Sequence, residues 1–289
     1  MVNNELDNNE RRDILKNNRV KHFFKEIHRA FRLQRIFAAL HLKKLMEYKI
    51  DFLIGAVGFL VEQVINIAFL TIVFGRVENL RGWGYYEVLF IYGFSLFPNG
   101  LDHLFFDNIW NVGYWMIRKG DFDKYLTRPI NTLLIVTVEE FQVDAFGKLI
   151  VGVALIVTSL RHIDLPFVWY DIPLALIAII FGTLIYAAIK TILGTIAFWT
   201  KRSGHLMEVT YNLNQFSQYP VSIYSRAVRG AVTYVIPFAL TSYYPASYLL
   251  RHTQPVFSIL APVVAAVILM TAALFIWHKG LGAYESAGN

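Results

Sequence analysis

The sequence predicts an all-helical integral membrane protein, and two observations support this prediction. Of its 289 residues, 56% are hydrophobic and only 17% are charged, whereas charged residues make up about 25% of a soluble domain. Several apolar runs approach the length of about 20 residues that an α-helix needs to cross a bilayer. The chain contains no cysteine, which excludes disulfides, thiolate nucleophiles and cysteine metal sites.

The first fifty residues are polar, so no cleavable signal peptide is expected. Residues 1–19 are rich in asparagine and are predicted to be disordered. Residues 20–50 place Phe23, Ile27 and Phe31 on one helical face and predict a basic amphipathic helix in the headgroup interface. A solvated basic helix and a calmodulin target are the alternatives. The cations on its other faces are Lys21, Lys25, Arg32 and Arg35.

Apolar runs predict membrane spans at about 52–74, 85–106, 132–160, 172–199 and 256–277. The third of these begins with acidic residues, so its start is expected to project from the membrane. Within it, Asp144 and Lys148 are spaced to pair on one helix face. Pro173 lies at the start of the fourth span, where the missing N–H costs least.

Residues 205–250 fit no ordinary span, because they are too long for one helix and too polar for two. Residues 205–225 are polar, and residues 231–250 are interrupted by Pro237 and Pro245. The sequence leaves open whether 231–250 crosses the membrane, and therefore whether the chain has six spans or seven. Polar side chains at membrane depth are expected to face another helix or a water-accessible path. We therefore predict a transport pathway or a subunit interface formed by Tyr211, Asn212, Asn214, Gln215, Gln218 and Tyr219.

The distribution of basic residues predicts the orientation of the chain. Most of the 27 Lys and Arg residues fall in residues 1–51, in the segment after the second span, and at Lys201 and Arg202. By the positive-inside rule these segments are cytoplasmic, so we expect a cytoplasmic N-terminus. This bias also explains the net charge of +6 without a nucleic-acid partner. Membrane lipids are expected around the spans.

Two ionisable residues are expected deep in the membrane. Glu62 lies about ten residues into the first span and Lys190 about ten residues from the end of the fourth, so both are about 15 Å deep. A charge at that depth is costly unless it is paired or faces a cavity. Glu62 and Lys190 are predicted to form an ion pair or to line a pathway. The alternatives are that each contacts separate polar groups, or that Glu62 is protonated.

Motifs for catalysis are weak or absent in this chain. No GxxxxGK[ST] loop occurs, so the chain is not expected to hydrolyse ATP. Asp121 and Asp123 form a lone DxD flanked by cations, and Asp102, His103 and Asp107 cluster near the end of the second span. A metal site is conceivable at either place, but interfacial polar residues are the simpler interpretation, and no metal is expected.

The segment Ile117–Asn131, IRKGDFDKYLTRPIN, separates two long apolar runs. Its charges exclude it from hydrocarbon, so it must form a structured loop at one membrane face. We expect Asp121 or Asp123 to cap a helix there. The predicted contact surface for a partner protein consists of Arg118, Lys119, Gly120, Asp121, Asp123, Lys124, Arg128 and Pro129.

This loop resembles that of ABC-2 type transporter permeases, and in particular of a bacterial subfamily of similar length. The matching positions are Arg118, Gly120, Asp121, Leu126, Arg128 and Pro129. A second stretch, VIPFALTSYYPASYLL at Val235–Leu250, is similar to the segment that precedes the last span in that subfamily. The resemblance covers about residues 50–279, nearly the whole membrane part.

The resemblance implies six transmembrane helices in a domain over 51–279, followed by a short tail over 280–289. It implies an N-terminal interfacial helix, a cytoplasmic coupling helix within about 111–127 and a re-entrant extracellular hairpin at 231–250. It also implies a non-enzymatic permease subunit of a bacterial exporter in the cytoplasmic membrane. Its implied partners are a separate ABC ATPase dimer, which would hold ATP and magnesium, and a second permease, more often a different chain than a copy.

Two other functions are compatible with the composition. An integral-membrane transferase acting on lipid-linked substrates would need carboxylates gathered at one interface. An ion-coupled carrier or channel would use Glu62 and Lys190. The exporter can work by alternating access or by widening a central path.

Overall fold

The computed structural model describes residues 49–140, 142–166 and 168–286. The disordered segment predicted for 1–19 and nearly all of the interfacial helix predicted for 20–50 lie outside these residues. Within the described residues the chain is helical and forms no β-strand. The longer helices are α2 Lys49–Phe74, α3 Tyr85–Phe105, α7 Thr132–Glu139, α8 Asp144–Leu160, α9 Asp171–Thr195, α11 Gly204–Asn212, α13 Tyr243–Arg251 and α14 Ala261–Gly282.

Short helical segments connect these helices. The segments α4 to α6 join α3 to α7, α10 extends α9, and the remainder lie between α11 and α14. They are α4 Ile109–Asn111, η1 Val112–Met116, α5 Ile117–Lys119, α6 Asp123–Leu126, α10 Ala197–Thr200, η2 Leu213–Gln218, η3 Val221–Ile223, α12 Arg226–Gly230, η4 Ala231–Val235, η5 Phe238–Leu240 and η6 Val256–Leu260.

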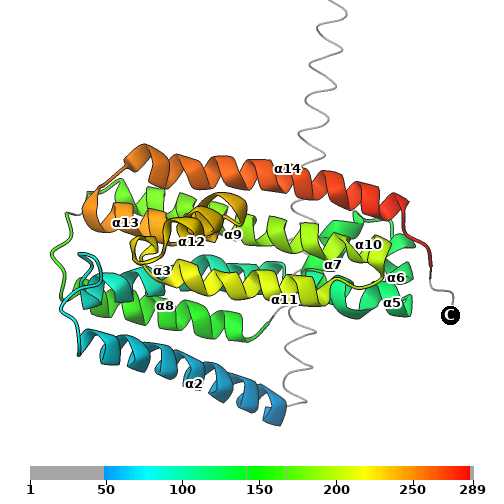
Figure 1. Ribbon diagram of the computed structural model, residues 1–289. Coiled ribbons are helices and arrows are strands. Elements are labelled where there is room, and N and C mark those ends of the chain that lie inside the picture. The colour runs from blue at the N-terminus through cyan, green and yellow to red at the C-terminus, as the bar shows by residue number, and fades with distance from the viewer. Residues whose placement is uncertain (1–48, 141, 167, 287–289) are drawn as a thin grey trace, which may run out of the picture.

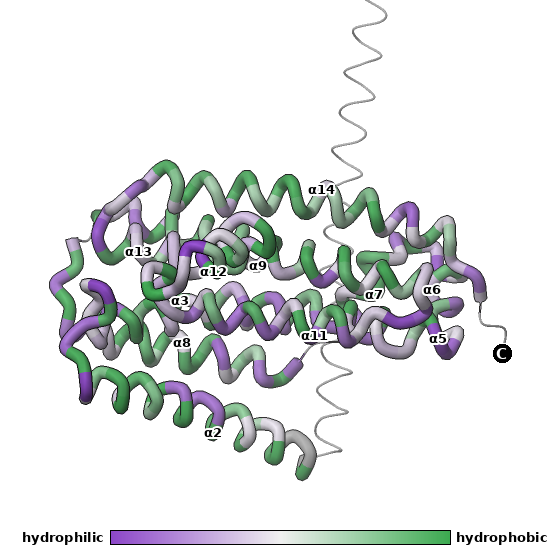
Figure 2. Tube along the Cα trace, in the orientation of Figure 1, coloured by the Kyte–Doolittle hydropathy of each residue, from purple (hydrophilic) through white to green (hydrophobic). Residues whose placement is uncertain are grey.

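The long helices lie side by side as a bundle with two ends (Figure 1). One end, which we call the loop end, carries α5, α6, α10 and the chain after α14. The other, the turn end, carries α13 and the connections that follow α2 and α8. Figure 2 shows hydrophobic residues along most of α2 and α14 and hydrophilic residues gathered at both ends. This is the pattern of helices that cross a hydrocarbon layer.

Three helical segments are long and apolar enough to cross a membrane: Leu53–Phe74, Asp171–Thr200 and Val256–Gly282. They confirm the spans predicted at 52–74, 172–199 and 256–277. A bent pair, α7 with α8, would make a fourth if it counts as one span. The predicted count of six spans is not reached by these criteria among the described residues.

Helix α3 forms over the predicted residues, but it is a core helix rather than a lipid-facing one. Most of its side chains from Val88 to Leu96 are buried. It packs closely on α8, because a Cβ added at Gly93 would lie 2.9 Å from Leu155 Cβ, and one at Gly152 would lie 3.0 Å from the Gly93 oxygen. Small residues allow membrane helices to approach this closely.

The helix predicted over 132–160 is interrupted. Helix α7 ends at Glu139, Glu140 has extended backbone, and α8 restarts at Asp144 with a bend of 72° between the two helices. The Gln142 N–H donates to the His103 oxygen at 3.1 Å instead of to its own helix. The acidic residues at this break have side-chain partners on other elements, which offset the hydrogen bonds lost from the helix.

Residues 231–250 form no continuous helix. The π-helical turn η4 ends before Pro237, the short η5 follows, and α13 begins only at Tyr243. The short η5 contacts both η4 before it and α13 after it. Proline has no backbone N–H and interrupts helical hydrogen bonding. Such irregular backbone is tolerated at membrane depth only where protein surrounds it, and the residues after Pro237, Phe238 to Leu240, are buried.

Candidate functional site

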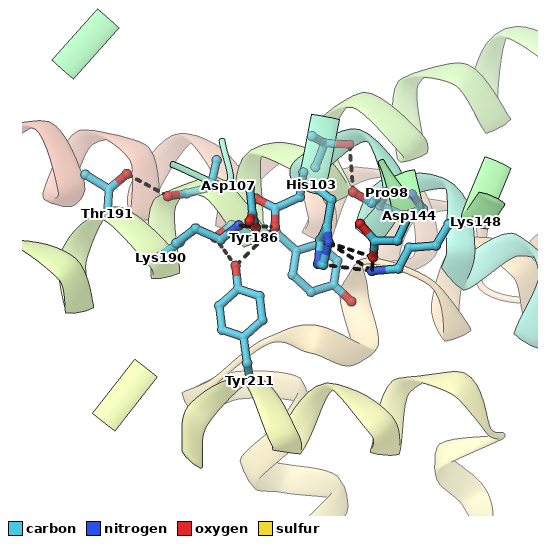
Figure 3. A network of polar contacts seen from close by, with 12 residues as sticks. Pro98, His103, Asp107, Asp144, Lys148, Tyr186, Lys190, Thr191 and Tyr211 are labelled. Carbon is cyan, nitrogen blue, oxygen red and sulfur yellow. Dashed lines mark hydrogen bonds and ion pairs between the residues drawn. The ribbon is translucent and has the colours of Figure 1, made fainter. Parts of the chain in front are cut away.

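The centre of the bundle holds a buried ammonium between two carboxylates (Figure 3). The Lys190 Nζ of α9 lies 2.7 Å from Asp102 Oδ2 and 3.0 Å from Asp107 Oδ1. Lys190 and Asp102 are fully buried and Asp107 is nearly so. The pair of Lys190 with Glu62 considered from the sequence is therefore wrong, because Glu62 lies on the exposed side of α2.

The end of α3 shapes this charged centre. Asp102 occupies the last turn of α3, where its carbonyl oxygen accepts from the Phe106 N–H at 2.8 Å. The helix then breaks, and α4 begins at Ile109, so that Asp107 returns to the same ammonium as Asp102. The chain continues beyond this break through α4, η1 and α5, so Asp102 and Asp107 are buried inside the bundle rather than exposed at its end, as the interfacial interpretation of the sequence expected.

Aromatic side chains complete the shell around Lys190. The single proton of the Tyr211 hydroxyl is shared between two acceptors, Asp102 Oδ2 at 3.3 Å and the backbone carbonyl oxygen of Tyr186 at 3.1 Å. The ammonium also lies 5.4 Å from the ring centroid of Tyr211 and 6.0 Å from that of Trp110. Asp102 Oδ1 is buried without a hydrogen-bond partner among the described residues. This arrangement ties α3, α4, α9 and α11 together.

A second charged group lies beside the first, on α3 and α8. His103 Nδ1 is 3.2 Å from Asp144 Oδ2, and Lys148 Nζ is 3.0 Å from the same oxygen. The predicted pairing of Asp144 with Lys148 is thus confirmed. Figure 3 shows that His103 faces Asp144 and Lys148 rather than Lys190.

Neither acidic cluster is arranged to bind a metal. Asp102 and Asp107 both contact an ammonium, which opposes a second cation, and His103 is engaged with Asp144. In the part of the chain that the structure describes, no group of three or more His, Cys, Asp or Glu side chains could hold a metal ion.

The polar stretch after α10 divides into two faces. Tyr211 and Asn214 point into the bundle, where Asn214 accepts from the Tyr186 and Ser217 hydroxyls. Asn212 and Gln215 are exposed, and Gln218 and Tyr219 are half-buried. An exposed amide on a bundle of this kind faces either another subunit or a polar path, so the two uses predicted from the sequence both remain for this outer face.

The charged loop between α5 and α7 is folded onto the bundle. Gly120 adopts a left-handed φ of 78°, which turns the chain sharply after α5. Phe122 and Tyr125 are fully buried, and the Lys124 ammonium lies 3.3 Å from Glu139 Oε1 on α7. The Tyr125 hydroxyl donates to Glu139 as well, and burial followed by this contact raises the pKa of Tyr125.

The two aspartates of the loop have different positions. Asp123 accepts hydrogen bonds from the Tyr284 and Ser286 hydroxyls at 2.8 and 2.5 Å, and these bonds lower the pKa of its carboxyl. Asp121 is exposed. Neither caps a helix: the side chain that does so is Asn131, whose Oδ1 accepts from the Leu134 N–H at the start of α7.

The remaining charged side chains of the loop project from the molecule. Arg118 and Lys119 are exposed and, like Asp121, have no ion-pair partner among the described residues. Arg128 is half-buried, with its guanidinium 5.8 Å from the ring centroid of Tyr125. Pro129 is exposed, and apolar Trp115 and Leu126 are 42% and 47% exposed nearby. This mixed surface is available for contact with a partner.

Residues 60–288 match the family model described as ABC-2 family transporter protein. The chain belongs to the ABC-2 transporter family. Comparison with curated proteins and with solved structures finds no match. Membership identifies a multi-pass membrane protein of a transporter, of a family whose permeases generally work with a partner ATPase, and it agrees with the resemblance at Arg118–Pro129 and Val235–Leu250.

Proposed function

We propose that the chain is the permease subunit of an ATP-driven exporter and that the 111–128 segment transmits movement from a separate ATPase subunit. The observation that carries this proposal is the division of the loop into two sides. Phe122, Tyr125 and Lys124 hold it against the bundle, whereas Arg118 and Lys119 are exposed and form no ion pair with any residue that the structure describes. A loop that only joined two helices would need no such rigid attachment.

The exposed side has the composition of a protein-binding surface. Cations and a carboxylate lie beside partly exposed Trp115 and Leu126. Aromatic residues and arginine are enriched in protein interfaces, and charges of both signs fix the register of binding. ATP and magnesium would be bound by the ATPase subunit, and this chain would supply only the docking surface and the transport path.

The permease would act as a pair with a second permease, in a bacterial cytoplasmic membrane with the loop end inside. Two polar features of the bundle surface support pairing. Glu62 is exposed near the middle of the lipid-exposed helix α2, and Asn212 and Gln215 are exposed on the α11–η2 segment. A carboxylate facing hydrocarbon is costly, so contact with polar groups of a second permease, or with a path between the two, would stabilise it.

The arrangement of the bundle supports six crossings rather than the three or four identified by length and apolarity. Helix α3 packs against α8 and α9, and with α4, η1 and α5 it would make one crossing, while the α7–α8 pair would make another. The broken segment between α11 and α13 would supply one crossing, with 231–250 as a re-entrant hairpin at the turn end.

The test is purification of the tagged chain from its native membrane with a mild detergent, followed by identification of the proteins that co-purify. We expect an ABC ATPase and a second permease subunit in a stoichiometry of two ATPase domains per permease pair. Recovery of the chain without any ATPase, from membranes in which it is correctly inserted and active in transport, would reject the proposal.

A further inference from the structure

The segment that follows α14 is held against the charged loop. The Tyr284 hydroxyl donates to Asp123 Oδ1 at 2.8 Å, and the Ser286 hydroxyl donates to Asp123 Oδ2 at 2.5 Å. Both oxygens of one loop carboxylate are therefore used by this segment. The Glu285 carbonyl oxygen also accepts from Lys201 Nζ at 3.3 Å, so the same segment is joined to the end of α10.

Aromatic packing surrounds these hydrogen bonds. The Phe122 ring centroid lies 5.2 Å from that of Tyr284, 5.0 Å from that of Phe198 and 6.1 Å from that of Trp277. These four rings come from the loop, α10, α14 and the segment after α14. Edge-to-face aromatic contacts add stability beyond the area that they bury, so four elements meet at one rigid point.

We propose that Tyr284 and Ser286, together with Asp123 and Lys201, form a clasp that makes α14 part of the coupling element. Tyr284 and Ser286 are positioning residues: they hold the loop at Asp123 while its exposed cations contact the ATPase. This proposal rests on the proposed function, and it adds a second mechanical connection to the one expected from the loop itself.

The geometry explains why a second connection is useful. On one side, Tyr125 and Lys124 attach the loop to Glu139 of α7. On the other, Asp123 attaches it to the segment after α14, and α14 packs along α9. A force applied at the exposed side of the loop therefore reaches α7 and α14 together. Without the clasp, the turn at Gly120 would let the loop bend on one side and dissipate the movement.

The first experiment removes the hydroxyls and keeps the packing. In the full complex reconstituted into liposomes, the double variant Tyr284→Phe with Ser286→Ala retains the aromatic ring but loses both bonds to Asp123. We expect transport per ATP hydrolysed to fall by at least roughly threefold, since each of the two lost hydrogen bonds typically changes an equilibrium by about two- to tenfold. The amount of ATPase subunit that co-purifies with each permease should be unchanged. The variant Ser286→Thr, which keeps a hydroxyl, should have the same transport per ATP hydrolysed as the unmodified chain.

The matched control is Tyr170→Phe, which removes a hydroxyl at the turn end, where Tyr170 is 40% exposed and distant from the loop. Its coupling ratio should equal that of the unmodified chain. A double variant that inserts, retains the ATPase and shows an unchanged coupling ratio would overturn the clasp.

A second experiment covers the case in which the double variant fails to fold. The chain has no cysteine, so Asp123→Cys with Ser286→Cys introduces a single possible crosslink. Under reducing conditions the clasp is broken and coupling should be low. Joining the two thiols by oxidation or with a short bifunctional reagent should restore it at least about threefold. Crosslinked protein that couples no better than reduced protein would show that the loop and α14 need not move together.

Different results would reject the proposed function and the clasp. If the unmodified chain retains no ATPase subunit, the proposed function is wrong. If the ATPase is retained and transport is coupled, but the coupling ratio is insensitive both to the hydroxyls and to the crosslink, only the clasp is wrong.

Discussion

The two ends of the bundle contain charged side chains with opposite arrangements. At the turn end, Arg251 forms two hydrogen bonds with Glu87, at 2.8 and 2.7 Å, and a third with the Gly82 oxygen. Its guanidinium carbon lies 3.7 Å from the ring centroid of Trp83. At the loop end, Arg118 and Lys119 are exposed without an ion-pair partner in the described part of the chain.

This difference separates charges that hold the fold from charges available to a partner. The arrangement around Arg251 fastens the end of α13 to the start of α3, and His252 adds a contact with Asp171 at 3.1 Å. The irregular 231–251 segment is thereby fixed at its far end. The loop end instead fixes its backbone by Phe122 and Tyr125 and leaves its outer charges unused. Exposed arginines occur at the turn end too, at Arg76 and Arg161, but there they do not belong to a folded loop whose other side chains are buried in the bundle, as Arg118 and Lys119 do at the loop end.

The largest expected effect lies between the two ends, at the buried charges. Lys190→Ala would leave Asp102 and Asp107 buried without a counter-charge, which typically costs about 3 to 5 kcal/mol. We expect the variant to insert poorly or to lose heat stability in detergent, measured by the recovery of monodisperse protein after heating. Lys190→Met with Asp102→Asn and Asp107→Asn should recover most of the loss.

A second pair of variants tests whether Lys190 pairs with Asp102 and Asp107 rather than with Glu62. Lys190→Glu combined with Glu62→Lys should give no rescue over Lys190→Glu alone, because Glu62 lies on the exposed side of α2. A double variant as stable as the unmodified chain would contradict the contacts with Asp102 and Asp107.

The next effect concerns the turn end. Arg251→Ala removes hydrogen bonds to a carboxylate, which contribute roughly 1.5 to 3 kcal/mol when an ionised group takes part, reduced here by partial solvent exposure. We expect lower heat stability but unchanged retention of the ATPase subunit. Arg161→Ala, an exposed arginine at the same end, is the control and should change neither. Loss of ATPase retention with intact stability would break the proposed division between the two ends.

At the loop we expect loss of ATPase binding without loss of stability. Arg118→Glu with Lys119→Glu should change stability by no more than about 0.5 kcal/mol, as is usual for exposed positions. ATPase retention after detergent purification should fall at least about tenfold, corresponding to about 1.4 kcal/mol of binding. Arg76→Glu with Arg161→Glu makes the same change of charge at the turn end and should retain the ATPase. Equal losses in both pairs would indicate a nonspecific effect of charge.

The sequence predicted the features that depend on composition along the chain. The apolar runs at 52–74, 172–199 and 256–277 became long helices, because about 20 apolar residues have few other stable arrangements in a membrane. The loop at Ile117–Asn131 was found from its charges. The i, i+4 spacing of Asp144 and Lys148 was sufficient for their contact, since that spacing alone brings two side chains together on a helix.

The partners of Lys190 could not be found in the same way. The sequence predicts that Glu62 and Lys190 lie at the same depth in the membrane. It does not predict the direction in which each side chain points, because that depends on how the helices pack. The break after Phe105 was also hidden, so Asp102 and Asp107 were interpreted as interfacial. A partial signal was present, since a lysine in a span requires an acidic partner or a cavity and Asp102 and Asp107 are two aspartates close together near the end of a predicted span.

The contacts of Asp123 show the same limit at the loop. Its partners Tyr284 and Ser286 lie about 160 residues further along the chain, and nothing in the local sequence connects them. Because Asp123 is an aspartate, the sequence analysis predicted that it would accept hydrogen bonds, but from N–H groups at the start of a nearby helix. The donors instead come from the segment after α14, whose position is set by the packing of α14 on α9.

The smallest expected effect is the response of this contact to pH. The hydrogen bonds from Ser286 and Tyr284 lower the pKa of Asp123 below its ordinary value of 3.8. Their contribution to stability is therefore complete above that value and is lost as the pH falls through the lowered pKa. Burial, and then the contact with Asp123, raises the pKa of Tyr284 to about 12 from 10.0. Its contribution is complete below pH 10 and is lost as the pH rises toward 12.

A probe attached at Glu285→Cys reports this contact, because the Lys201 bond at this residue uses the backbone oxygen. We expect constant probe mobility between about pH 5 and 9, greater mobility below the ordinary pKa of the carboxyl, and greater mobility in the alkaline range. In Asp123→Asn the acid transition should disappear while helix content, followed by circular dichroism, stays the same. A transition near neutral pH would contradict the assignment, since neither Asp123 nor Tyr284 changes its protonation there.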